Sequence, residues 1–259
     1  MQNRRTKLES IFMIRSSIQT KTSGFGVERR AREMAERERV ILCAAERLIG
    51  DHGFHGAGMC EIAREAEYAI GTLYGLFPSK EVLFERLVES RAQELATAIH
   101  AALAGTGTVR ERLAHAWRAK LAFFVRHLHF LRIYAAASPM ASTVWGAPAG
   151  AARIRRDTLR AVADTIAEGQ RLGELDPGAS ALDLAVAFQN LSTSFLIEAV
   201  TENGELAQER AHDAMERVYF ERTLGAPPAR SRGRARGGAT VPTARARRAA
   251  VRTTPRARR

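Results

Sequence analysis

The chain has 259 residues, of which 46% are hydrophobic, so it can bury a sizeable core. No apolar run approaches the ~18 residues of a membrane span, and the patch from Leu8 to Ile18 is interrupted by Arg15 and lacks a signal-peptide cleavage site. Cys43 and Cys60 have no metal-ligand spacing, which favours two buried thiols in a reducing cytoplasm, and we expect neither a metal nor a cofactor.

The excess positive charge lies at the two ends of the sequence. Residues 1–34 carry eight basic and three acidic residues (+5), 35–80 carry five and seven (−2), 81–224 carry sixteen and eighteen (−2), and 225–259 carry eleven arginines and no acid (+11), which sum to +12. Residues 1–31 show no sustained helical period, and 225–259 contain only two valines beyond alanine as apolar content. We therefore expect a disordered basic arm and a disordered arginine-rich tail.

The first clear helical pattern covers about 32–50. Apolar residues such as Ile41 and Ala45 recur there at the spacing of one helix face. Gly50 and Gly53 follow, and we expect the helix to end at this pair.

Two short helices are expected over 58–77. The first covers 58–66, a four-residue turn follows, and the second starts at Ile70 and ends before Pro78, because proline disfavours the helical conformation of the residue before it. Ser79 then offers a side-chain oxygen to cap the next helix. Two short helices joined by a tight turn form a helix-turn-helix, whose second helix can enter a DNA major groove.

This stretch resembles the DNA-binding domain of the TetR family of bacterial transcriptional regulators. The residues that carry the resemblance are Gly53, Phe54, Ile62, Ala63, Ala66, Gly71, Thr72, Leu73, Tyr74, Phe77, Ser79, Lys80, Glu81 and Leu83. The resemblance covers roughly 35–95 and implies an all-α fold. It places a helix-turn-helix domain over 32–80 and a larger regulatory and dimerisation domain over 81–224. Leu73 and Phe77 are expected to be core residues of the first domain.

The resemblance also implies a set of DNA contacts. These are Ala69, Ile70, Gly71, Thr72, Tyr74, Leu76 and Lys80. Tyr74 and Lys80 would meet phosphates, whereas Thr72 and the exposed start of the helix would face bases or the DNA backbone. Gly71 has no side chain, so DNA could approach it closely.

The sequence departs from the family pattern at several positions. Glu67 stands where relatives usually have glycine, in a turn that favours positive φ, which costs a non-glycine residue roughly 1–2 kcal/mol. Gly58 replaces the usual Ser or Thr cap, which is a small loss. Leu76 stands where many relatives carry histidine, and Ile70 can offer a base only apolar contact. These departures predict weaker sequence-specific binding and leave the expected fold unchanged.

The rest of the sequence shows helical patterns without the alternation of a strand. The expected helices cover about 79–104, 108–127, 130–137, 150–172, 179–201 and 205–223, and a loop is expected over 138–149. The helix over 179–201 is apolar nearly all round, so one side can face its own core while the other requires a partner. We therefore expect the last two helices to form a homodimer contact.

Aromatic and polar residues in these helices are candidates for a ligand cavity. They are Trp117, Phe124, His127, Tyr134, Phe188 and Ser192. Aromatic residues at helical spacing are more often plain core, so both interpretations stay open. The resemblance implies that the second domain binds a small, largely apolar molecule. We see no catalytic triad or carboxylate pair and no glycine-rich phosphate loop, and a metal site at His127 and His129 is not expected.

The sequence therefore predicts a cytoplasmic, nucleoid-associated DNA-binding regulator that is not an enzyme. We expect a ligand-responsive repressor acting as a homodimer on a near-palindromic operator of double-stranded DNA. One alternative is a nucleoid-type architectural protein with little sequence specificity, whose basic ends supply the affinity. Another is a small-molecule carrier on the same helical scaffold.

Overall fold

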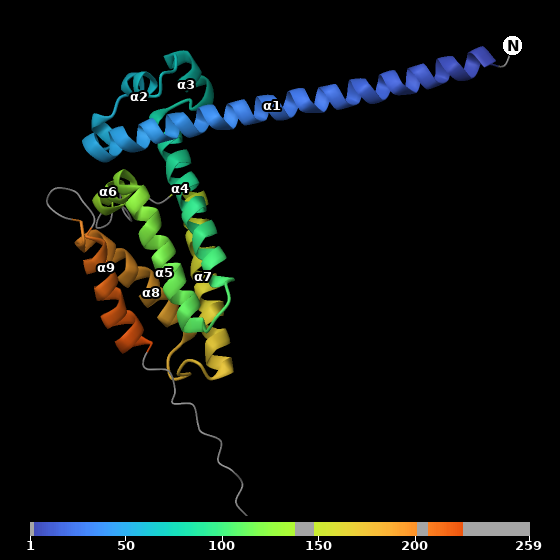
Figure 1. Ribbon diagram of the computed structural model, residues 1–259. Coiled ribbons are helices and arrows are strands. Elements are labelled where there is room, and N and C mark those ends of the chain that lie inside the picture. Colours follow the sequence, from blue (N-terminus) through green and yellow to red (C-terminus); the bar gives the residue numbers. More distant parts are fainter. Residues whose placement is uncertain (1–2, 138–147, 201–206, 225–259) are drawn as a thin grey trace, which may run out of the picture. The chain divides into compact units, whose positions relative to one another are not determined.

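The computed structural model describes residues 3–137, 148–200 and 207–224, with side chains from residue 28 onward. The regular elements in these ranges are helices, which confirms the all-α fold class (Figure 1). In chain order they are α1 (Asn3–Gly56), α2 (Met59–Glu65), α3 (Ile70–Leu76), α4 (Lys80–Leu103), α5 (Val109–Arg126), α6 (Leu128–Ala137), α7 (Ala149–Leu172), α8 (Ala181–Glu198), α9 (Gln208–Met215) and the π-helical segment η1 (Glu216–Thr223). None of the described helices combines the length and apolar character needed to cross a membrane.

Helix α1 is longer than the sequence predicts. The arm expected to lack regular structure over 1–31 has a helical backbone from Asn3 onward. Residues 3–23 contain neither glycine nor proline, and the helix continues through Gly24 and Gly26 into the pattern expected over 32–50. At the other end, Gly53 has φ 74° and ψ 167°, which kinks the chain before the last turn and confirms the break expected at this glycine.

The turn between α2 and α3 has the strained backbone that the sequence indicates. Gly58 is the N-cap of α2 and has no side chain to accept from the first helix amides, while the Glu61 carboxylate accepts a 3.0 Å hydrogen bond from the Gly58 amide. Glu67 has φ 58°, and it is the only non-glycine residue with positive φ in the described ranges. The left-handed conformation predicted for Glu67 is therefore confirmed.

The junction between α3 and α4 also follows the sequence. Phe77, which precedes Pro78, leaves the helical region with φ −130° and ψ 98° and ends α3. The Ser79 hydroxyl then accepts a 3.3 Å hydrogen bond from the Val82 amide at the start of α4. Proline and serine thus separate two helices that would otherwise run on.

Two hydrophobic cores support the described helices. The first joins α1, α2 and α3 to the start of α4 through Leu83 and Leu87 and to α6 through Ile133. The second lies among α4 to α9 and η1 and includes Trp117, Phe188 and Tyr219, whose hydroxyl donates a 3.1 Å hydrogen bond to the carbonyl of Leu184. The small core thus uses residues beyond position 80, so α4 belongs to both cores.

The helices predicted for the larger domain are confirmed within a few residues. Helix α4 packs against α5 and α7, α7 packs against α8, and α8 packs against α9. The cysteines differ from expectation: Cys43 is partly exposed and Cys60 is exposed, because Cys60 lies off the face of α2 that buries Ile62 and Ala63. Most of the loop predicted over 138–149 and the tail over 225–259 lie outside the described residues.

Candidate DNA-binding surface and internal cavity

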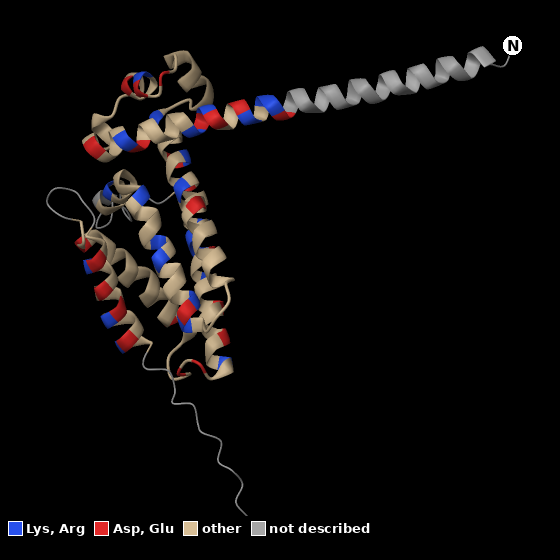
Figure 2. Ribbon diagram, viewed as in Figure 1, with Lys and Arg blue, Asp and Glu red and all other residues tan. Residues whose placement is uncertain are grey.

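Helix α3 presents a small, uncharged surface to solvent. The side chains of Ile70 and Tyr74 are 39% and 50% exposed, and Ala69 at the N-terminus of the helix is exposed as well. A Cβ atom added to Gly71 or Gly75 would meet nothing within 4 Å. No charged residue lies on this helix (Figure 2). The exposed surface of α3 can therefore approach another molecule closely.

The opposite side of α3 holds the helix in place. Leu73 is fully buried and Phe77 is buried in the small core, as expected. Leu76 is partly buried and packs against the same core, while Thr72 is half-buried. The predicted contact residues therefore divide into an exposed group around Ile70 and Tyr74 and two residues that share the core boundary.

Lys80 has intramolecular partners that the sequence did not indicate. Its Nζ donates hydrogen bonds to the carbonyls of Phe54 at 2.8 Å and Ala57 at 3.2 Å. The same nitrogen lies 4.5 Å from the centroid of the Phe54 ring, a cation–π contact. Lys80 thus ties the start of α4 to the bend that follows Gly53, and two of the three N–H donors that a lysine ammonium has are occupied.

A cavity of about 170 Å³ lies among α4, α5, α6, α7 and α8. Four of the six residues predicted to line a ligand site border it: Phe124, Tyr134, Phe188 and Ser192. The wall is mostly aliphatic and aromatic and includes Leu95 and Ile99 of α4, Phe124 of α5 and Phe188 of α8. At ~10–15 Å³ for each water-sized group, the volume corresponds to roughly 11 to 17 such groups.

The other two predicted lining residues lie elsewhere. Trp117 is fully buried in the larger core, where its indole Nε1 donates a 3.3 Å hydrogen bond to Nδ1 of His212. His127 caps the end of α5 and contacts two carboxylates. Trp117 is therefore a core residue, which is one of the two interpretations that its sequence position left open.

Lys120 and Arg155 also border the cavity, and the sequence analysis identified neither of them. Lys120 is 6% exposed, and its Nζ lies 2.7 Å from Ser192 Oγ and 2.8 Å from Thr193 Oγ1. Burial lowers the pKa of Lys120 to about 7, because the charged form loses its hydration. The available signal was a lysine at position 120 on the otherwise apolar face of a predicted helix.

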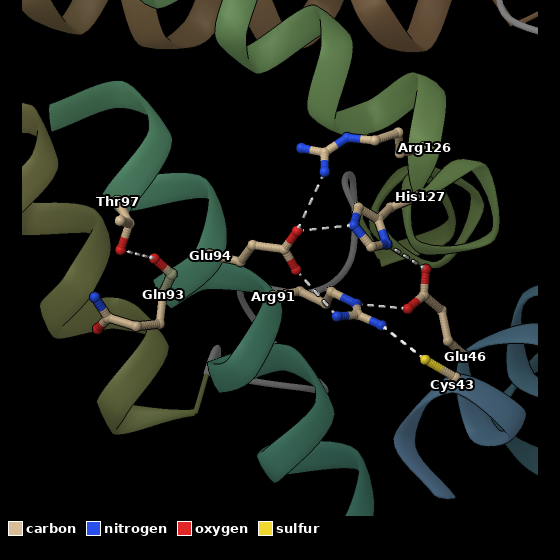
Figure 3. Close-up of polar contacts among 8 residues, drawn as sticks. All are labelled: Cys43, Glu46, Arg91, Gln93, Glu94, Thr97, Arg126 and His127. Atoms are coloured by element: carbon tan, nitrogen blue, oxygen red, sulfur yellow. Dashed lines mark hydrogen bonds and ion pairs between the residues drawn. The ribbon is translucent and has the colours of Figure 1, made fainter. Parts of the chain in front are cut away.

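A polar cluster, buried at Glu46 and Arg91 and partly exposed at Glu94 and His127, links α1 to α4 and to the end of α5 (Figure 3). Arg91 Nε lies 2.6 Å from Glu46 Oε2, and Arg91 Nη1 lies 3.1 Å from Glu94 Oε2. His127 reaches both carboxylates, with Nδ1 3.4 Å from Glu46 and Nε2 3.1 Å from Glu94. His127 thus bridges the same two carboxylates that Arg91 contacts.

The electrostatics of this cluster favour ionised Glu46. Burial raises the pKa of the Glu46 carboxyl, but hydrogen bonds from His127 and Arg91 outweigh it and hold the pKa below its ordinary value. Arg91 also donates to Cys43 Sγ at 3.5 Å. We refer to Glu46, Arg91, Glu94 and His127 as the α1–α4 cluster.

Helix α8 buries more of its apolar surface within the chain than its sequence suggests. Leu184, Phe188 and Leu196 are buried, whereas Leu182 and Val186, one turn apart, are 54% and 38% exposed. The outward side is therefore apolar near the start of the helix. Further along, the exposed positions are polar.

The comparisons with known proteins agree with this architecture. A family profile described as "Bacterial regulatory proteins, tetR family" matches residues 41–87. The HTH-type transcriptional activator FasR of Mycolicibacterium smegmatis is 36% identical over 78 residues, which cover 30% of this chain and 36% of FasR. The sequence similarity thus spans about a third of the length of this relative.

Solved structures resemble a larger part of the chain. The transcriptional regulator FadR from Bacillus subtilis, in complex with stearoyl-CoA, has a TM-score of 0.61 at 17% identity, covering 69% of this chain and 95% of FadR. The ketosteroid transcriptional regulator KstR2 of Mycobacterium tuberculosis has a TM-score of 0.57 at 18% identity, covering 71% and 95%. At these identities, the similarity is one of fold.

Proposed function

The chain belongs to the TetR family of transcriptional regulators, and on that premise we propose that it is a ligand-responsive repressor that binds a near-palindromic operator as a homodimer. The observation that supports DNA binding is the exposed surface of α3. Ile70 and Tyr74 are exposed there, and a Cβ atom added to Gly71 or Gly75 would meet no other atom within 4 Å. A short helix with an uncharged, sterically open face fits the major groove.

Each exposed residue of α3 has a role in this proposal. Ile70 contacts a thymine methyl group, Gly71 lets the DNA backbone approach, and the Tyr74 hydroxyl donates to a phosphate. Thr72, at the boundary of the core, reaches a base edge. Lys80 mainly positions α4 through the carbonyls of Phe54 and Ala57, and its remaining N–H can still face a phosphate.

The proposed dimer contact uses the exposed apolar start of α8. Leu182 and Val186 are partly exposed there, and Val218 of η1 is exposed as well. In a two-fold dimer, the two α3 helices must lie about one DNA turn apart, or a multiple of it, to bind a near-palindromic site.

We further propose that the cavity holds a small, largely apolar effector and that the α1–α4 cluster transmits its presence. The cavity borders α4, and the cluster joins α4 to α1, whose last turns support α2 and α3. An effector changes DNA binding only if it binds one arrangement of these helices better than the other. The stearoyl-CoA in the FadR complex supports a lipid-like ligand for this fold.

The basic ends of the sequence favour one alternative function. An architectural protein would bind any duplex through its basic arm and arginine-rich tail, which carry +5 and +11 over 1–34 and 225–259. In that case α3 would contribute little to binding. The two functions differ in sequence preference, which can be measured directly.

Selection of bound duplexes from a random DNA pool tests the proposal. The pool is offered to the full-length protein and to a variant that lacks 225–259, both at physiological salt with excess non-specific competitor. We expect both proteins to enrich the same near-palindromic sequence. Failure of both to enrich any sequence, with retained binding to bulk DNA, would reject the regulator and favour the architectural protein.

A further inference from the structure

Lys120 is a cation in an apolar cavity without an acidic partner. Its ammonium contacts only the hydroxyls of Ser192 and Thr193, and no carboxylate borders the cavity among the described residues. Lysine is almost never fully buried unless it is paired with an opposite charge. This arrangement therefore requires an explanation beyond packing.

The two hydroxyls act as acceptors toward Lys120. Ser192 Oγ and Thr193 Oγ1 each donate their own hydrogen to the carbonyl of Gln189, at 3.0 Å and 2.9 Å. Both contacts with Lys120 are therefore N–H donations, and an ammonium has three such donors. The third N–H has no partner among the described residues. Neutral hydroxyl dipoles also leave the positive charge uncompensated.

The cavity offers a complement to this cation. Its walls are mostly apolar, and its polar groups besides Lys120 are few, among them Tyr134 and the exposed Arg155. A planar carboxylate needs few donors and gains a charge-assisted hydrogen bond from Lys120. A phosphate monoester carries a charge of roughly −1.5 to −2 at pH 7, which a single buried lysine cannot neutralise.

We propose that the effector is an aliphatic monocarboxylate, with its carboxylate on Lys120 and its hydrocarbon chain along Leu95, Ile99 and Phe188. This inference rests on the proposed function, because it specifies the ligand of the same cavity. Lys120 is then kept in the core as the recognition group for the effector, at a cost to the stability of the empty protein.

The proposal has a consequence for pH. A bound carboxylate favours the charged form of Lys120, so its pKa rises from about 7 toward the ordinary value for lysine. Binding above pH 7 therefore takes up a proton, and affinity falls as pH rises from 7 to 9. Among the residues that the structure describes, the other ionisable groups that line the cavity are Tyr134 from α6 and Arg155 from α7, and the lining residues of α4 and α8 contribute none.

The experiment compares n-alkyl carboxylates of six to twelve carbons with the alcohols of the same lengths. Each is titrated into the wild type, Lys120→Met and Arg155→Met, with calorimetry in two buffers of different ionisation heat. We expect at least one carboxylate to bind the wild type about ten-fold more tightly than its alcohol, which corresponds to one charge-assisted contact. Lys120→Met should lose this preference, Arg155→Met should keep it, and the two buffers should reveal proton uptake at pH 7.5.

A second measurement uses the protein without any ligand. Lys120→Met removes an uncompensated buried charge and keeps most of the length of the side chain, so its Tm should be equal to or above that of the wild type. The sign with pH follows from the lowered pKa: between about 7 and 10.5 the unfolded chain binds the proton and the folded chain does not, so wild-type stability rises with pH there. The advantage of Lys120→Met should therefore shrink from pH 7 to pH 9.5.

Three results would overturn the inference: equal binding of acids and alcohols, no binding of any member of the series, or a Tm of Lys120→Met well below that of the wild type. The last would make Lys120 a structural tie between α5 and α8. None of these results bears on the selection of DNA from a random pool, which uses no effector. The DNA-binding function and the effector class are thus tested separately.

Discussion

At the scale of single residues, Tyr74 is the sharpest test of the surface of α3. Its ring is half exposed, so Tyr74→Phe keeps the packing and removes only the hydroxyl. If the hydroxyl donates to a phosphate, operator affinity should fall about ten-fold, because a hydrogen bond to a charged group contributes ~1.5 kcal/mol or more. Affinity is measured by fluorescence anisotropy on the selected operator.

Thr72→Ala is the matched comparison for Tyr74→Phe. Phosphate contacts fix register and base contacts specify sequence, so this variant should change the preferred sequence, whereas Tyr74→Phe should not. Unchanged operator affinity of Tyr74→Phe, with an unchanged circular dichroism spectrum, would remove the hydroxyl from the DNA contact.

Glu67 gives a prediction about backbone strain. At φ 58°, glycine is free of the penalty that an L-residue carries, so Glu67→Gly should stabilise the fold by about 1 kcal/mol. For a domain of this size the expected rise in Tm is ~2–4 °C. Thermal unfolding followed by circular dichroism measures it.

The control variant for this position is Glu67→Gln, which keeps the side chain at positive φ and removes only the negative charge. It should leave the Tm unchanged and raise DNA affinity if the turn lies near phosphates. Equal Tm values for Glu67→Gly and the wild type would mean that the turn carries no strain.

Residue roles could be predicted where they depend on near neighbours in the sequence. The conformation of Glu67, the cap of Ser79 and the stop at Pro78 depend on residues a few positions away. The carbonyl contacts of Lys80 join positions 23 and 26 residues apart, and the contact of Lys120 with Ser192 joins positions 72 apart. Such contacts depend on how helices pack, which one sequence does not fix.

At the scale of helices, the α1–α4 cluster gives a prediction about coupling. Arg91→Met leaves the buried Glu46 carboxylate without its closest cation, so the free energy of unfolding should fall by about 3 kcal/mol. Arg86→Met is the matched control on the same helix, because Arg86 also pairs with α1, through Glu38, but is half exposed. Its loss should stay below ~1 kcal/mol. Urea unfolding measures both.

The cluster also predicts a dependence on pH. Because the pKa of Glu46 is lowered in the folded protein, the stability that its charge contributes is present above about 4.5 and is lost as the pH falls through the folded-state value. The difference in the free energy of unfolding between the wild type and Glu46→Gln should therefore shrink below that pH.

Equal losses in the free energy of unfolding for Arg91→Met and Arg86→Met would show that burial adds nothing to the pair of Arg91 with Glu46.

Helix α8 gives the prediction about assembly. Leu182→Glu and Val186→Glu place a charge on the exposed apolar start of this helix, so both variants should sediment as monomers at micromolar concentration. The control is Leu172→Glu, because Leu172 is 63% exposed at the end of α7, and this variant should remain a dimer. Analytical ultracentrifugation distinguishes these outcomes, and a monomeric wild type would refute the dimer.

Helices were predictable from periodicity and from their caps, and contacts between helices were not. Ser79 and Thr108 begin α4 and α5 where expected, and Gly173 ends α7 in the left-handed conformation. The all-round apolar sequence of α8 suggested a wholly unpartnered side. Within one chain, however, α7, α9 and η1, the helices before and after α8 in the sequence, pack against it.

At the scale of the whole molecule, charge is the feature that separates body from tail. Residues 35–224 carry a net charge of −4, from −2 over 35–80 and −2 over 81–224, whereas 225–259 carry +11. Each phosphate that an arginine neutralises adds roughly 0.9 to the slope of log affinity against log salt. Removing 225–259 should flatten this slope by several units and should lower non-specific affinity most.

The control for the tail is the ratio of operator to non-specific affinity. Arginines that contact only phosphates raise the affinity for all sequences equally, so this ratio should stay the same after truncation. Equal salt slopes for the full-length and truncated proteins would show that the tail does not touch DNA.

The measurement that bears most directly on a dimeric DNA-binding regulator is a hydroxyl-radical footprint of the selected operator with the full-length protein. Two symmetric α3 helices predict two protected patches on one face of the duplex, with centres ~10–10.5 base pairs apart or a whole multiple of that spacing. Each patch should coincide with one half of the near-palindrome. A single patch, or uniform protection along the duplex, would contradict the account.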